Sequence, residues 1–160
     1  MGLIKVENIL NTMGVALRSN RERAAKLIIY QPELLQPLFQ LSLNPEFKNH
    51  HKGAWILEII LEQNLQLIGP HINFYCENLN KVKNPSAVRA LSKINHWIAY
   101  DYIKNNSLNT KYLTKENIYQ IVTVGFDRMI QDYPVATQVY TMDTLFYFGQ
   151  LKKNGIGMGT

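Results

Sequence analysis

The sequence predicts an all-α fold in which roughly seven to eight helices pair antiparallel and stack side by side into an α-α superhelix. Proline, glycine and asparagine divide the 160 residues into segments of helical length. Inside these segments apolar residues recur every three or four positions, and the alternation typical of strands is nearly absent. We therefore expect a right-handed stack of three to four helical pairs rather than a closed bundle.

The first half of the chain contains several helical segments separated by short breaks. Five helical ranges are expected there: 3–17, 20–30, 32–43, 48–63 and 65–82. The first is interrupted near Gly14, and Ser19 is the expected N-cap of the second. Pro32 suits the first turn of the third helix, whereas Gly69 and Pro70 should kink or delimit the fifth.

The second half should contain three longer helices. Asn84 followed by Pro85 is typical of an N-cap and first turn, and this helix runs through Tyr102. After the polar connection 105–112, Thr114 with Asn117 falls short of a full capping box but still marks a helix start. Pro134 begins the last helix, through Phe148. We expect one helical-repeat domain over 1–154 and a frayed, flexible tail over 155–160.

Four segments share a pattern that indicates an internal repeat. Each places a small residue near the start of a helix and an apolar or small residue three positions later; the pairs are Ala25 and Ile28, Ala54 and Leu57, Ala87 and Ala90, and Ala136 and Val139. Alanine at such a position lets a neighbouring helix approach closely, which the stacking of helical hairpins requires. The spacing therefore favours a stack over a bundle.

Composition excludes several classes of protein. Hydrophobic residues make up 46% and charged residues 18%, which is typical of a folded globular chain. Cys76 is the single cysteine, so an intramolecular disulfide and a thiolate zinc site are excluded. The chain start lacks a secretory signal pattern, and no uncharged apolar run could span a bilayer. We expect a soluble cytoplasmic protein that does not bind membranes.

Three stretches resemble a known family of helical repeats: His51-Lys-Gly-Ala-Trp-Ile-Leu-Glu58, Asn84-Pro-Ser-Ala-Val-Arg-Ala-Leu-Ser-Lys-Ile94 and Val135-Ala-Thr-Gln-Val-Tyr-Thr-Met-Asp-Thr-Leu145. Over about residues 20–154 the chain resembles HEAT and armadillo repeats, and more narrowly HEAT-like proteins of Bacteroidetes bacteria. Some of those carry an adenylosuccinate lyase label, but the Met-Pro-x-Lys-x-Asn motif of the lyases has no match here. The resemblance implies a longer C-terminus, which would leave the side carrying Phe146 and Phe148 partly uncovered.

No sequence motif predicts a particular catalytic activity for the chain. Nucleotide-binding, phosphoryl-transfer and nucleophile-elbow motifs are missing, as are paired carboxylates. The adjacent His50 and His51 point about 100° apart on a helix and cannot share a metal, and they are expected at a solvated helix start. We therefore predict no catalytic residue, no cofactor and no metal site.

One side of the helix that begins at Pro85 carries a candidate binding stripe: Arg89, Lys93, His96, Tyr100 and Lys104. Further basic clusters occur at 18–26 and at 81–83, and together these could contact phosphates or an acidic protein segment. Trp97 and Asp101 lie one turn apart beside the stripe. They resemble the aromatic and acidic pair of HEAT-like DNA glycosylases, for which Arg128 is a candidate third residue.

The pattern favours a non-enzymatic interaction module with a protein partner, most simply in a bacterial cytoplasm. The alternative is nucleic-acid binding, with or without base excision, as in alkylation-repair glycosylases. A third hypothesis is a protein associated with adenylosuccinate lyase. Neither the oligomeric state nor the identity of the partner follows from the sequence.

Overall fold

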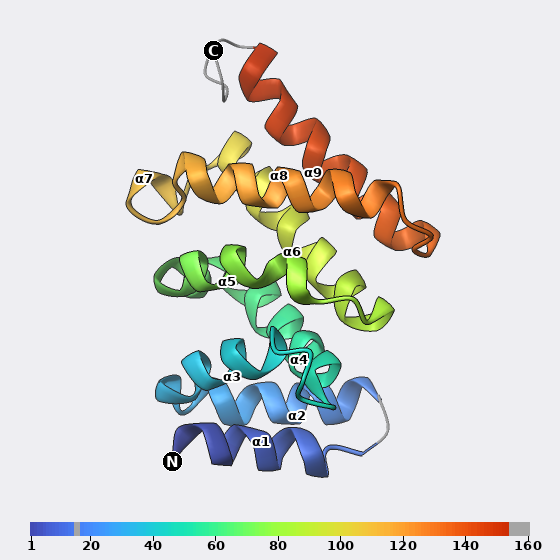
Figure 1. Ribbon diagram of the computed structural model, residues 1–160. Helices are drawn as coiled ribbons and strands as arrows, with labels where there is room; N and C mark the ends of the chain where they lie inside the picture. The colour runs from blue at the N-terminus through green and yellow to red at the C-terminus, as the bar shows by residue number, and fades with distance from the viewer. Residues whose placement is uncertain (15–16, 154–160) are drawn as a thin grey trace.

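The chain forms an elongated stack of helices with its first helix at one end and its last helix at the other (Figure 1). This computed structural model describes residues 1–14 and 17–153, and all regular structure within them is helical. The core runs through the stack as one continuous cluster of buried side chains. The predicted all-α stack is therefore confirmed, whereas the tail expected at 155–160 lies outside the described residues.

The helices form two layers that alternate along the chain (Figure 1). The first layer consists of α2 (Arg18–Ile29), α4 (His50–Gln63), α6 (Pro85–Lys104) and α9 (Val135–Lys153). The second layer consists of α1 (Gly2–Thr12), α3 (Leu35–Ser42), α5 (Ile72–Asn78) and α8 (Lys115–Met129). In the first layer each helix packs against the next, while α3 packs on α4, and α8 on α9, across the layers. The connections contain the short α7 (Asn109–Tyr112) and 3-10 turns at Pro32–Leu34, Leu65–His71 and Leu79–Lys81.

Local capping explains where the two best-defined helices begin. The Asn84 side-chain oxygen accepts hydrogen bonds from the backbone N–H groups of Ser86 and Ala87, at 2.9 and 3.1 Å, so the expected start of α6 is confirmed. At α8 the bonds are reciprocal, because Asn117 N–H donates to the Thr114 hydroxyl and Thr114 N–H donates to the Asn117 side chain. A full capping box forms where a weaker start was expected, because asparagine can replace glutamate in it.

Several predicted boundaries in the first half are wrong. The first helix ends at Thr12 instead of reaching position 17, and Leu17 rather than Ser19 is the N-cap of α2. The helix expected over 65–82, with a kink or boundary at Gly69 and Pro70, is split into a 3-10 turn that contains both residues, α5 and a second 3-10 turn. Pro70 lies inside the first of these turns, where its missing N–H removes a helical hydrogen bond.

The alanine repeat lies entirely in the first layer, and three of its four copies pack as expected. Ala25, Ala54 and Ala87 are buried between neighbouring helices. In α9, however, Ala136 is exposed and Thr137 is buried in its place, so the fourth copy is shifted by one residue. Close approach is most evident at Gly53, because a Cβ atom there would lie 3.2 Å from Cα of Ser42 on α3.

Two expectations about exposure are also wrong. His50 is buried rather than solvated, and its Nδ1 lies 2.9 Å from the carbonyl oxygen of Phe47 in the turn before α4. Phe148 is buried with its ring 6.1 Å from that of Tyr102, so only Phe146 of the two phenylalanines is left uncovered. Helical phase explains the difference, since residues two positions apart point about 200° apart on a helix.

Candidate interaction face

The predicted binding stripe lies on the outer side of the first layer, along α6. Arg89, Tyr100 and Lys104 are exposed, whereas Lys93 and His96 are half-buried between α6 and its neighbours. All five residues share one side of the helix because their spacings of three and four follow its turn. The structure therefore brings the predicted stripe together with the outer sides of α4 and α9.

Acidic residues of the adjacent helices neutralise part of the stripe. Lys93 Nζ lies 3.3 Å from a carboxylate oxygen of Glu58 on α4, and both side chains are largely buried. His96 Nδ1 lies 3.7 Å from a carboxylate oxygen of Asp143 on α9. Among the described residues, no carboxylate pairs with Arg89 or Lys104. The stripe is thus less positive than the sequence of α6 alone indicates.

Aromatic side chains of α4, α6 and α9 accompany the stripe, and we call this set the aromatic ridge: Trp55, Trp97, Tyr100, Tyr140 and Tyr147. The guanidinium of Arg21 on α2 lies 4.3 Å from the centre of the Trp55 ring. Lys93 Nζ lies 5.5 Å from the ring of Trp97. The rings of Tyr100 and Tyr147 meet edge to face at 5.5 Å.

The contribution of α9 to this ridge was missed from the sequence. The His96 ring lies 6.0 Å from that of Tyr140 and 5.7 Å from that of Tyr147. The available signal was the spacing of seven between the two tyrosines, which places them on one side of a helix. Spacing alone could not show that this side faces α6.

His96 is the titratable group at the centre of the face. Burial lowers the pKa of its imidazole below the usual value because it penalises the charged ring, and the nearby Asp143 carboxylate opposes that shift. His51, in edge-to-face contact with Trp55, has a lowered pKa chiefly because of burial as well. Both imidazoles are therefore neutral near pH 7, which reduces the positive charge of the face further.

The acidic and basic residues that the resemblance to DNA glycosylases suggests, Asp101 and Arg128, do not come together in one site. Asp101 is buried, and its carboxylate accepts hydrogen bonds from the N–H and the hydroxyl of Ser107, at 3.0 and 2.7 Å. It therefore holds the loop after α6. Arg128 is buried in the second layer and donates to the carbonyl of Leu79 at 3.1 Å. Arg128 lines a cavity of about 20 Å³ between the segment that precedes α6 and the C-terminal part of α8 with the turn after it. Burial lowers the pKa of the Arg128 guanidinium.

The remaining basic clusters are divided between the ridge and other parts of the molecule. Arg18 pairs with Glu22 and Glu62, at 2.9 and 4.0 Å, near the ridge. Arg23 instead lines a hollow between α1 and α2. Lys81 and Lys83 lie beside hollows of the second layer. The clusters do not form one continuous positive surface.

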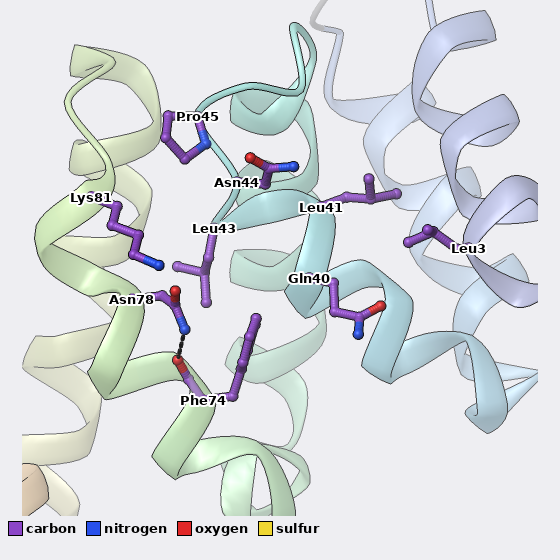
Figure 2. A pocket seen from close by; sticks show the side chains of 9 residues that line it. All are labelled: Leu3, Gln40, Leu41, Leu43, Asn44, Pro45, Phe74, Asn78 and Lys81. Carbon is purple, nitrogen blue, oxygen red and sulfur yellow. Dashed lines mark hydrogen bonds between the residues drawn. The ribbon is translucent and has the colours of Figure 1, made fainter.

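A separate groove of about 380 Å³ lies on the second layer, between α1, α3 and α5 (Figure 2). Phe74 stands in it partly exposed, and the side chain of Asn78 donates to the Phe74 carbonyl at 2.8 Å. Lys81 is the sole charged residue among its lining side chains. The groove can receive an apolar side chain, but its lining offers no acid and base pair for catalysis.

Residues 1–14 and 17–153 contain no cluster of metal-binding side chains and no membrane-spanning helix. Within these residues no group of three or more histidine, cysteine or acidic side chains is placed to hold a metal ion. None of their helices combines the length and apolarity needed to cross a bilayer. Burial raises the pKa of the Cys76 thiol well above its usual range, so this cysteine is a poor nucleophile.

Comparison of the chain with protein-family models, curated proteins and solved structures finds no match.

Proposed function

We propose that the chain is a non-enzymatic interaction module that presents the aromatic ridge to a protein partner. The observation that carries the proposal is the composition of this face, in which half-exposed tryptophan and tyrosine rings lie beside arginine and lysine. These residue types dominate the binding energy of protein interfaces. They are also set on four packed helices, which gives a partner a preorganised surface.

The charge of the face supports a protein partner over nucleic acid. Binding to phosphates depends on several cations that release counterions, and its strength grows with their number. Here Glu58 pairs with Lys93, and Asp143 lies beside His96. Arg89 and Lys104 remain as the exposed cations of the stripe. A mixed surface of this kind suits a partner with apolar and acidic side chains.

The proposal is tested by affinity capture with a matched pair of variants. The full chain, Tyr100→Ala and Phe74→Ala are immobilised, and retained proteins are quantified by mass spectrometry. Both residues are aromatic and similarly exposed, but Phe74 lies in the groove of the second layer. Loss of an interface tyrosine costs about 2 kcal/mol or more, so capture of a true partner should fall roughly 30-fold for Tyr100→Ala alone. Equal capture by both variants would contradict a partner on the ridge.

Nucleic-acid binding is a second candidate because Lys104 Nζ lies 6.0 Å from the exposed ring of Tyr100, on which a base can stack, and Arg89 is exposed about three turns earlier in α6. It predicts that the affinity for DNA falls with salt with a logarithmic slope of about −2 to −3, and that Arg89→Glu abolishes binding. Fluorescence anisotropy of labelled duplex and single-stranded DNA over a salt series measures this directly. If no salt-dependent binding is observed, the nucleic-acid hypothesis is excluded.

A further inference from the structure

The last helix of the stack buries three threonines and exposes a continuous apolar stripe. The residues of α9 that face the core are Thr137, Thr141, Thr144 and Phe148. On the opposite side of the helix Val135, Val139, Met142 and Phe146 are exposed. Their spacing of four, three and four residues makes them one continuous stripe. An amphipathic helix normally has the reverse arrangement, so the outward stripe is the side that requires an explanation.

The preceding helix extends the same apolar surface. On α8 and the residue after it, Tyr119, Phe126 and Ile130 are exposed on the side opposite to the buried residues of the helix. We call these three residues and the α9 stripe the C-terminal end face. Figure 1 shows that α8 and α9 form the last pair of the stack, so no described helix covers this end.

The C-terminal end face is large enough for a stable interface. Its three aromatic side chains, Tyr119, Phe126 and Phe146, are 61%, 61% and 62% exposed. Since such rings bury about 150–250 Å² each when enclosed, they alone leave roughly 300–450 Å² uncovered. With its four aliphatic side chains the face approaches the about 800 Å² that each partner contributes to a standard interface. Exposed patches of this size mark interaction sites on soluble proteins.

Charge distribution indicates what covers the face. Between Val135 and Gln150 the single charged residue is Asp143, and it points toward His96 rather than to the end face. Two copies of the α9 stripe can therefore meet without bringing like charges together. In an antiparallel pair Val139 of one copy lies beside Met142 of the second copy, and Val135 lies beside Phe146, because the stripe is centred between Val139 and Met142.

The opposite end of the stack is more polar than this face. On α1 and α2 the exposed sides away from the core carry Asn8, Asn11, Arg23 and Lys26 between the apolar residues Ile4 and Leu27. Head-to-tail stacking would bury these polar and charged groups against apolar side chains, which is costly. We infer that two copies of the chain associate through their C-terminal end faces, with α9 packed antiparallel on α9 of the second copy about a two-fold axis. The resulting dimer is closed.

Sedimentation equilibrium of the full chain over about 1–500 μM tests this inference, because association of this kind falls in the micromolar range. The expected mass at high concentration is twice 18.5 kDa, with no larger species. Val139→Lys, which keeps a helix-forming residue at an exposed position, should shift the dimer dissociation constant upward by at least 30-fold with an unchanged helical circular dichroism spectrum. Tyr30→Lys, at the exposed end of α2, should leave the dimer unchanged.

Several results would overturn the inference. A chain that stays monomeric at every concentration would overturn it. This holds even if the monomer binds another protein through Val139, because the C-terminal end face would then be covered by a different chain. Species that keep growing with concentration would indicate head-to-tail stacking instead of a closed pair. An unaltered dimer of Val139→Lys would place the contact elsewhere on the molecule.

Discussion

The two ends of the stack differ in the side chains that they bury and expose. At the N-terminal end α1 buries Val6 and Leu10 and exposes Asn8 and Asn11 beside Ile4. At the C-terminal end α9 buries threonines and exposes an apolar stripe. A repeat array needs polar outer sides at its free ends for solubility. The difference is that polar side chains interrupt the exposed apolar residues of α1 and α2, whereas the stripe on α9 is continuous.

The largest expected change in the free energy of unfolding distinguishes a substitution on the inward side of α9 from one on its outward side. Phe148→Ala should lower the free energy of unfolding by about 3–5 kcal/mol, because its buried ring leaves a cavity beside Tyr102. Phe146→Ala, two residues away and exposed, should change the free energy of unfolding of the monomer by less than about 0.5 kcal/mol. Urea denaturation at concentrations where the chain is monomeric measures both. Equal losses would mean that α9 packs in a different rotation.

Substitution of the threonines on the inward side of α9 should change the free energy of unfolding by a smaller amount. The Thr137 hydroxyl is buried without a hydrogen-bond partner, so Thr137→Val should raise the free energy of unfolding by about 1 kcal/mol. The hydroxyl of Thr141 donates to the carbonyl of Thr137 at 2.8 Å, and Thr141→Val should be neutral within about 0.5 kcal/mol. Denaturation in the Val139→Lys background removes any contribution of dimer formation. A destabilised Thr137→Val would show that its hydroxyl has a polar partner.

The beginnings of helices could be predicted from the sequence because the bonds that define them are local. Asn84 caps α6 through N–H groups two and three residues away, and proline acts on its own turn. The stripe on α6 was likewise predictable from helical phase. These are properties of single helices, which sequence spacing describes directly.

Contacts between helices were not predictable in the same way. The approach of Asp143 to His96 depends on how α9 lies across α6, 47 residues apart in the chain. The rotation of α9 was ambiguous for a different reason, since its apolar residues occur on both sides and periodicity does not select one of them. Packing of Thr137, Thr141 and Phe148 against α6 and α8 decides which side is buried. Because that side of α9 is buried, the apolar stripe on the opposite side is exposed.

The last expected effect concerns pH and tests the middle of the stack against both ends, because all four histidines lie between the start of α4 and the end of α6. His51, His71 and His96 have pKa values lowered chiefly by burial. Between those values and about 6.5 the unfolded chain binds more protons than the folded chain. The free energy of unfolding should therefore fall as the pH is lowered through about 6.5, by at most about 1.4 kcal/mol per pH unit for each histidine, and level off below the folded-state pKa values.

Asp143→Asn sharpens this prediction at the contact between α6 and α9. The carboxylate of Asp143 raises the pKa of His96 against the effect of burial, so its removal should lower that pKa further. The loss of stability on acidification should then extend to lower pH than in the unaltered chain. NMR titration of the His96 ring measures the pKa, with His71, which Asp143 does not influence, as the internal control. A raised pKa of His96 in this variant would contradict a favourable interaction with Asp143, and with it the position of α9 on which the exposed stripe depends.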